Sequence, residues 1–250
     1  MENLEIDTIN LTETLMEVCQ KIRDATQGTT IENSNLTPPD IIYKGLEQFC
    51  EIMLHLDHTV ENDEKPEFDD NDAKLDELAD FGLGLIEQLM DWAEWADMMD
   101  ERETLDDLII TVGVWCARYL GKMKQIEPVV NALSKVANNN SEPEFLAELS
   151  QIYNEIANAV APEVKKDLEG SKPQQPWRIL NLNYAIVATR SHDPALMEQA
   201  FEQILVRLDD EDARGFFREG LEQMDSVGYP DHVRHMMEKY YQLTNKPTLH

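Results

Sequence analysis

The chain has 250 residues, of which 42% are hydrophobic and 28% charged, and its 50 acidic residues outnumber its 21 Lys and Arg residues to give a net charge of −29. This length and apolar content suit a folded protein with a buried core and argue against a chain that is disordered throughout. Because so acidic a surface is repelled by polyphosphate, we expect no direct binding of nucleic acid.

We expect the chain to carry no export signal, because residues 1–10 hold three acids, no Lys or Arg and no apolar run. The longest nearly uncharged stretch, residues 108–117, is too short to cross a bilayer, so we also expect no membrane association. Three cysteines, odd in number and far apart, predict reduced thiols and a cytoplasmic location. They are Cys19, Cys50 and Cys116.

Apolar residues recur at helical spacing along almost the whole chain. After Thr37 they follow a 4-3-4-3-4 pattern from Ile42 to Val60. Thr37 and Pro38 predict the cap and the first residue of this helix. An acidic loop then leads to a helix of about 28 residues that starts at Ala73.

Two glycines, Gly82 and Gly84, lie within that second helix and indicate close packing against a neighbouring helix. Thr104 predicts the start of the next helix, which ends near Gly121. Apolar residues surround the axis of this helix, which marks it as a central helix of the core.

The second half of the chain carries further helix boundaries. Ser141 and Glu144 form a capping box, and the prolines after Asp193 and Tyr229 predict two more helix starts. Glycines at predicted helix ends are Gly28, Gly121, Gly170 and Gly228. No alternating apolar run with a tight turn occurs, so we expect no β-hairpin. The predicted fold class is therefore all-α, with about ten helices.

Four prolines of the second half are 34, 32 and 36 residues apart. They are Pro128, Pro162, Pro194 and Pro230. Two-helix units of this length are typical of tetratricopeptide (TPR) and HEAT repeats, so one prediction is an irregular TPR/HEAT-like superhelix of antiparallel helical hairpins. The other is a non-repetitive helical bundle, because average helices give similar spacing. The TPR consensus fails here, since it places Arg218 and Asp225 where it needs alanine.

Charge is distributed unevenly along the chain. Residues 1–107 carry a net charge of −24 and residues 108–250 carry −5, while six of the nine arginines lie in the last 73 residues. We predict a single all-α domain over residues 1–250. Within it we distinguish an acidic N-terminal helical part, residues 1–122, from a C-terminal part of helical hairpins, residues 123–250.

Two histidine pairs have His-x-x-His spacing, which can bring two metal ligands together on a helix. His55 and His58 lie opposite the apolar stripe of their helix, and so do His232 and His235. Because a functional metal site needs a third ligand and a supporting shell, we predict no metal site at either pair. The acidic segment 63–72 lacks the glycine and final glutamate of an EF-hand.

The sequence contains no motif typical of nucleophilic catalysis or of phosphate binding, such as Gly-x-Ser-x-Gly or Gly-x-x-x-x-Gly-Lys. Ser191, His192 and Asp193 are contiguous, whereas catalytic triads assemble from separated segments. The cysteines lie in or beside apolar stripes, where an uncharged thiol is usual. We therefore expect no enzyme activity and predict no catalytic residue and no cofactor.

One candidate for partner binding is a face of the helix after Ala73, where five carboxylates line one side and a tryptophan lies at their margin. The residues are Asp76, Asp80, Glu87, Asp91, Glu94 and Trp95. An exposed tryptophan beside carboxylates can anchor a basic partner. The alternative is a solvated face with Trp95 packed against a neighbouring element.

A second candidate is the pair Arg214 and Arg218, which share one helix face. Their guanidinium groups, with Arg178 and Arg190, suit bidentate recognition of a carboxylate or a phosphate. The alternative is pairing with acids at helical spacing, namely Asp210, Asp212 or Glu222.

From these features we expect a non-catalytic interaction or scaffold protein of the cytosol, whose acidic face engages a basic partner protein. Mimicry of nucleic acid by the carboxylates is a narrower form of this hypothesis. The alternative is a helical enzyme or sensor that binds a small molecule or metal between helices, near Trp92, Trp115 and the C-terminal arginines. Self-association is a third hypothesis, because 11 methionines supply adaptable apolar surface.

Overall fold

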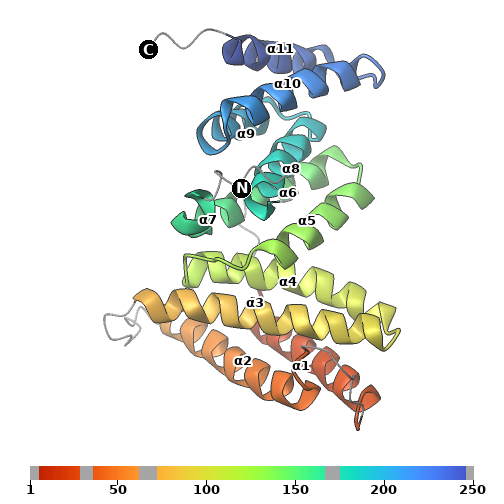
Figure 1. Cartoon of the computed structure of the whole chain (residues 1–250), viewed down its shortest axis with the longest axis vertical. Helices are drawn as coiled ribbons and strands as arrows, with labels where there is room; N and C mark the ends of the chain where they lie inside the picture. The colour runs from red at the N-terminus through yellow and green to blue at the C-terminus, as the bar shows by residue number, and fades with distance from the viewer. Residues whose placement is uncertain (1–5, 29–35, 62–71, 167–174, 246–250) are drawn as a thin grey trace. The chain divides into compact units, whose positions relative to one another are not determined.

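A computed structural model describes residues 6–28, 36–61, 72–166 and 175–245, which form eleven helices (Figure 1). The prediction of an all-α fold is confirmed. The helices are α1 (Thr8–Ala25), α2 (Pro39–Glu61), α3 (Asp72–Trp95), α4 (Met99–Tyr119), α5 (Glu127–Asn139), α6 (Pro143–Ala159), α7 (Pro162–Lys166), α8 (Pro176–Arg190), α9 (Pro194–Arg207), α10 (Asp210–Met224) and α11 (Asp231–Thr244). No helix in the described ranges is long and apolar enough to cross a membrane.

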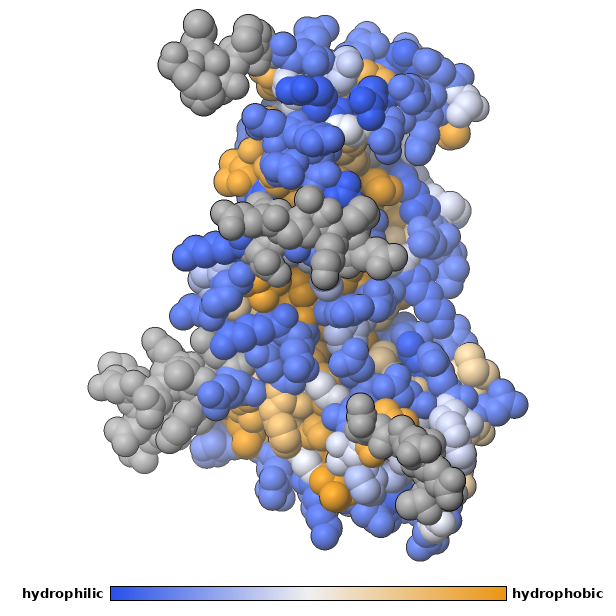
Figure 2. Space-filling model, viewed as in Figure 1, coloured by the Kyte–Doolittle hydropathy of each residue, from blue (hydrophilic) through white to orange (hydrophobic). Residues whose placement is uncertain are grey.

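The chain divides into two compact units, Met1–Ala132 and Leu133–His250, with the boundary inside α5. The division after residue 122 that charge and helix pattern favour lies within the first unit. Hydrophilic residues cover most of the face in Figure 2, as the net charge of −29 requires. Each unit has its own apolar core.

In the first unit the successive helices α1 to α4 lie side by side (Figure 1). The central helix is α4, which packs against both α1 and α3 and is buried on several sides. Its Trp115 is fully buried, stacks on Tyr119 at 4.9 Å between ring centroids and meets the edge of Phe49 at 6.2 Å. The indole N–H of Trp92 donates to the carbonyl of Thr37 at 2.9 Å and so ties α3 to the start of α2.

The close packing predicted at Gly82 is present between α2 and α3. A Cβ atom at Gly82 would lie 2.4 Å from the ring of Phe49, which is shorter than any real carbon contact. The reciprocal contact occurs at Gly45 of α2, where a Cβ atom would lie 2.7 Å from the side chain of Leu85. The two helices therefore approach each other through glycine on both sides.

The boundary between α3 and α4 differs from the prediction, because α3 ends at Trp95 and α4 begins at Met99 rather than at Thr104. Asp97 adopts the left-handed conformation, with φ of 56°, and the N–H of Met98 donates to the carbonyl of Ala93 at 2.9 Å. This is a helix-terminating geometry that usually falls on glycine. Because an aspartate occupies the position, the sequence gives no signal for the turn.

Other helix ends match or miss the prediction for local reasons. The helix start predicted after Asp193 is confirmed, and the Asp193 carboxylate caps α9 by accepting the N–H groups of Ala195 and Leu196. The predicted capping box at Ser141 is wrong, because α6 begins at Pro143, whose fixed φ suits the first helical position. Gly28 and Gly121 have positive φ at the ends of their helices, and Gly170 lies outside the described residues.

In the second unit α8 packs against α6 and α9, and α11 packs against α9 and α10. The core between α9, α10 and α11 is aromatic, and Phe201 lies at its centre against Phe216, Phe217 and Tyr240. The evenly spaced prolines open α5, α7 and α9 and precede α11, but α7 spans five residues whereas α9 spans 14. The helices that begin at these prolines therefore differ in length.

The three cysteines are buried and unpaired within their helices. Burial raises the pKa of the Cys19 thiol and of the Cys50 thiol to about 12, and it also raises the pKa of Cys116. Thiolate is the reactive form, so these groups are inert in the folded state.

We expect all three thiols of the native protein to resist a thiol reagent at pH 8 and to react at once after denaturation. A pKa of about 12 against an ordinary value of 9.0 reduces the thiolate fraction roughly a thousandfold. Since burial raises these values in the folded state, their contribution to stability is complete below pH 9 and is lost as the pH rises toward 12. Fast labelling of the native protein would show that a thiol is exposed.

Candidate functional site

A charged stripe of α3 combines two carboxylates with an exposed tryptophan. Glu87, Asp91 and Trp95 follow one another at four-residue spacing, so they lie on one face of the helix. Trp95 is 50% exposed and rests edge-on against Trp92, with 5.6 Å between the ring centroids. Asp91 is exposed and Glu87 is half-buried. We call these three residues the α3 stripe.

The α3 stripe carries negative charge that no cation of the described residues neutralises directly. Burial raises the pKa of Glu87, and the charges of Asp91 and Glu127 raise it further. Burial and the charge of Glu94 raise the pKa of Asp91, while Arg102 lowers it. Neither Glu87 nor Asp91 forms an ion pair in the part of the chain that the structure describes. A cation placed on the stripe would therefore relieve an existing repulsion.

The other carboxylates of the predicted acidic face have partners within the protein. Asp80 accepts the backbone N–H groups of Lys124 and Gln125 at 2.8 and 2.9 Å, so it fixes the loop before α5. Glu94 accepts a hydrogen bond from Arg102 at 3.0 Å across the α3–α4 turn. The side chain of Asp76 lies outside the described residues.

One contributor to this site, Glu127 on α5, is missing from the sequence-based prediction. Its charge raises the pKa of Glu87 although the two residues are 40 positions apart. No local pattern connects them, because their proximity depends on the packing of the loop before α5. Asp80 holds that loop by accepting the backbone N–H groups of Lys124 and Gln125.

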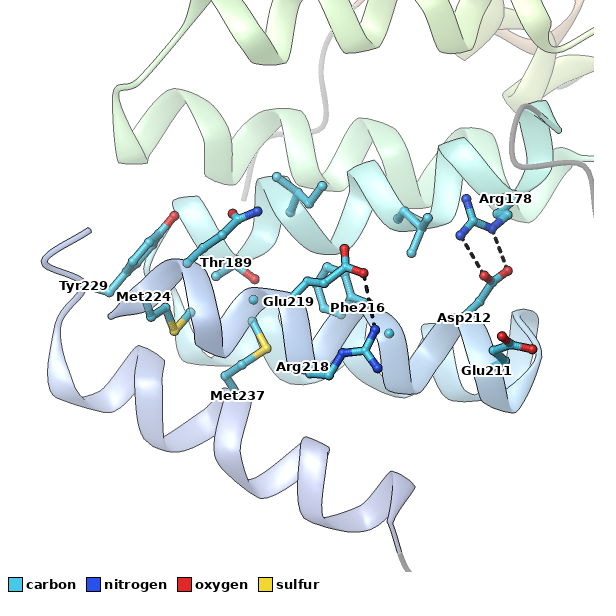
Figure 3. A pocket seen from close by; sticks show the side chains of 15 residues that line it. Arg178, Thr189, Glu211, Asp212, Phe216, Arg218, Glu219, Met224, Tyr229 and Met237 are labelled. Atoms are coloured by element: carbon cyan, nitrogen blue, oxygen red, sulfur yellow. Dashed lines mark hydrogen bonds and ion pairs between the residues drawn. The ribbon is translucent and has the colours of Figure 1, made fainter. Parts of the chain in front are cut away.

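A groove of about 340 Å³ opens in the second unit between α8 and α10 (Figure 3). Its volume is at the lower end of the range for small-molecule sites. Leu182 and Ile186 of α8 and Phe216 of α10 line the groove. Met224, Tyr229 and Met237 close one end. The other lining residues are Arg178, Thr189, Glu211, Asp212, Gly215, Arg218, Glu219, Gly220 and Gln223.

The arginines at this groove are engaged with acids. Arg178 forms a two-point ion pair with Asp212, with both N–O distances at 2.7 Å, and this pair joins α8 to α10. Arg218 lies 3.6 Å from the carboxylate of Glu219 and is exposed on the rim. Arg214 does not line the groove and donates to the carbonyl of Thr244 at 3.3 Å.

The groove matches part of the alternative hypothesis, which places a ligand site near Trp92, Trp115 and the C-terminal arginines. Two C-terminal arginines line it, but no tryptophan does, and Trp92 and Trp115 belong to the first unit. Arg190 lies elsewhere in the second unit, where it donates to the backbone carbonyls of Ala137 and Asn140.

Both histidine pairs occupy exposed positions. The ring Nε2 of His232 lies 2.9 Å from the carbonyl of His192, and burial together with the charge of His232 lowers the pKa of His192. Within the described ranges no group of three or more His, Cys, Asp or Glu side chains could hold a metal ion. The acidic segment 63–72 falls almost wholly outside those ranges.

Comparisons of the chain with protein-family models, with curated proteins and with solved structures gave no match. Among the described residues, the α3 stripe is a candidate surface for a partner protein and the groove between α8 and α10 is a candidate site for a small ligand.

Proposed function

We propose that the chain is a non-catalytic interaction protein whose α3 stripe binds a basic segment of another protein. The observation that supports this proposal most strongly is that Glu87 and Asp91, which form no ion pair among the described residues, share one helix face with the half-exposed ring of Trp95. A Lys or Arg side chain placed there gains Coulomb energy from both acids and a cation–π contact with the indole. Tryptophan is also the residue most enriched at the energetic centres of interfaces.

The charge of the whole N-terminal part supports the same proposal. A net charge of −24 over residues 1–107 steers a basic partner toward this half of the chain and speeds association at low salt. A cytosolic location, favoured by the unpaired cysteines, and a TPR- or HEAT-like scaffold of helical hairpins belong to the proposal as well.

A titration with a synthetic peptide rich in Lys and Arg tests the site. The pair of substitutions Glu87→Gln and Asp91→Asn should weaken binding roughly tenfold, because each exposed charge pair contributes about 0.2–1 kcal/mol. Trp95→Ala should weaken it by a similar factor through loss of the anchor. The matched control is Glu13→Gln with Glu47→Gln, which removes the same charge from exposed positions of α1 and α2 and should change affinity little.

The folded state of the α3 variant should be unharmed. Because the pKa values of Glu87 and Asp91 are raised in the fold, their ionisation opposes folding at neutral pH, and neutral amides remove that opposition. Equal affinity for the stripe variant and the control variant would show that the peptide senses only the net charge, and the proposed site would be wrong.

The second candidate function is binding of a small molecule in the groove between α8 and α10. The observation that favours it is a volume of about 340 Å³ with apolar walls and the paired charges of Arg178 and Asp212 at one end. A ligand of this groove should combine an apolar body with a polar group. A thermal-shift screen of such compounds tests this function. A hit should lose its effect when Gly215, which lines the groove and has open space at its Cβ position, is replaced by a bulky residue.

A further inference from the structure

Two cationic side chains of the second unit converge on one residue at the end of α6. The guanidinium of Arg207, in the last turn of α9, donates to the side-chain oxygen of Asn158 at 2.6 Å. The ammonium of Lys165, on α7, donates to the backbone carbonyl of the same Asn158 at 3.2 Å. Both cations also lie over the ring of Trp177, at 5.8 and 5.5 Å from its centroid.

No carboxylate of the described residues forms an ion pair with Arg207 or Lys165. Elsewhere in the second unit Arg178 reaches Asp212 and Lys239 reaches Glu198, whereas Arg190 and Arg214 donate to backbone carbonyls. The remaining partner of Arg207 is the amide oxygen of buried Asn181 at 3.3 Å. Burial lowers the pKa of Arg207, and burial together with the charge of Arg207 lowers the pKa of Lys165.

Two buried residues beside the cations carry polar atoms without a hydrogen-bond partner. The indole N–H of Trp177 and the hydroxyl of Tyr184 are buried without a hydrogen-bond partner, at 2% and 1% exposure of their residues. Tyr184 lies close enough to Arg207 for the cation to oppose the burial that raises the phenol pKa to about 12. Arg207 and Lys165 therefore bind only neutral amide and carbonyl oxygens of the described residues, and Trp177 and Tyr184 beside them each carry a buried polar atom without a hydrogen-bond partner.

We propose that Arg207 and Lys165 form a binding site for a phosphate dianion carried by a small molecule. Two positive charges match the charge of a phosphate monoester, whereas a carboxylate neutralises only one of them. The guanidinium fork suits two phosphate oxygens, and the ammonium acts as a point charge beside it. The site shares no residue with the groove or with the α3 stripe, so it is independent of the function proposed above.

A purely structural role for the two cations is the competing explanation. Cations near helix ends bind unpaired carbonyl groups and interact favourably with the helix dipole, as Lys165 does at the carbonyl of Asn158. In that case substitution of either cation destabilises the protein by the same amount whichever anion is in solution. A phosphate site instead makes their contribution depend on the anion.

Calorimetric and thermal titrations of the full chain with inorganic phosphate separate these explanations. At constant ionic strength phosphate should raise the melting temperature, whereas chloride and acetate should not. Lys165→Gln should weaken phosphate binding roughly tenfold, since a charge-assisted hydrogen bond is lost. Lys166→Gln removes the same charge from the adjacent, exposed residue and should leave affinity unchanged. Glycerol phosphate in place of inorganic phosphate distinguishes an ester from the free ion, and the proposal expects the ester to bind at least as tightly.

Two further readouts keep the test decisive where a variant folds poorly. Lys165→Arg should restore binding, and the pKa of the Lys165 ammonium, measured by nuclear magnetic resonance, should rise when phosphate binds because an anion favours the charged form. Equal effects of phosphate on the Lys165→Gln and Lys166→Gln variants, or no phosphate-dependent stabilisation of the natural chain, would overturn the proposal and leave the structural role.

Discussion

Replacing Phe201 with alanine should lower the free energy of unfolding by about 3–5 kcal/mol, the range for a fully buried phenylalanine. The Phe201 ring is completely buried and meets Phe217 at 5.1 Å, Tyr240 at 5.2 Å and Phe216 at 5.8 Å. These rings come from α9, α10 and α11, so a single side chain holds three helices together. Its removal leaves a cavity, whose cost adds to the transfer free energy lost with the ring.

Urea denaturation of the natural chain and the variant measures this loss. The control is Phe145→Ala, which removes the same side chain from a position of the second unit that is 38% exposed. Its effect should stay below about 1 kcal/mol, because little apolar area returns to water there. A similar loss for both variants would mean that the aromatic cluster does not hold the second unit together.

Replacing Gly82 with alanine should lower the free energy of unfolding by about 1–3 kcal/mol, the usual cost of forcing extra volume into a packed core. The new methyl group would lie 2.4 Å from the ring of Phe49, which is fully buried against Trp115 and cannot swing away. Helix propensity alone predicts the opposite sign, since alanine is favoured over glycine inside a helix by about 1 kcal/mol.

Gly215→Ala separates the effect of helix propensity from the effect of overpacking. Gly215 is also inside a helix, but no atom lies within 4 Å of the position that its new methyl group would take, so this substitution should stabilise the protein by up to about 1 kcal/mol. Phe49→Leu should recover part of the loss in the Gly82→Ala variant by giving the methyl group room. Stabilisation by both glycine substitutions would contradict the close approach of α2 and α3.

Much of the fold could be predicted from the sequence, because apolar spacing reports directly on helices. Boundaries were predicted well where capping chemistry is local, as at Asp193. They were missed where an unexpected residue type takes the role, as at left-handed Asp97, or where proline starts a helix after a competing cap, as at Pro143. Apolar spacing could not show the pairing of helices, which depends on contacts between distant segments.

The candidate sites also contain some features that helical spacing predicts and others that it cannot. The α3 stripe follows from helical spacing, so Glu87, Asp91 and Trp95 could be placed on one face. Spacing could not show that Asp80 holds Lys124 and Gln125, because those residues are more than 40 positions away.

The arginine contacts show the same limit. Helical spacing favoured Arg214 and Arg218, but the ion pair that joins two helices at the groove is Arg178 with Asp212, 34 positions apart. The meeting of Arg207 with Lys165 gave no sequence signal, because α6, α7 and α9 bring the two cations together.

The measurement that tests the proposed function most directly is a quantitative comparison of proteins captured from the lysate of the native source. The natural chain is compared with a Glu87→Gln, Asp91→Asn, Trp95→Ala variant and with a control that carries Glu13→Gln, Glu47→Gln and Phe81→Ala. Phe81 is also about half exposed, and both variants lose two charges and one exposed ring.

The account predicts a basic protein that the natural chain and the control retain at low salt, that high salt releases and that the α3 variant does not retain. Retention of the same basic proteins by all three chains, or capture that is insensitive to salt, would contradict the α3 stripe as the binding site.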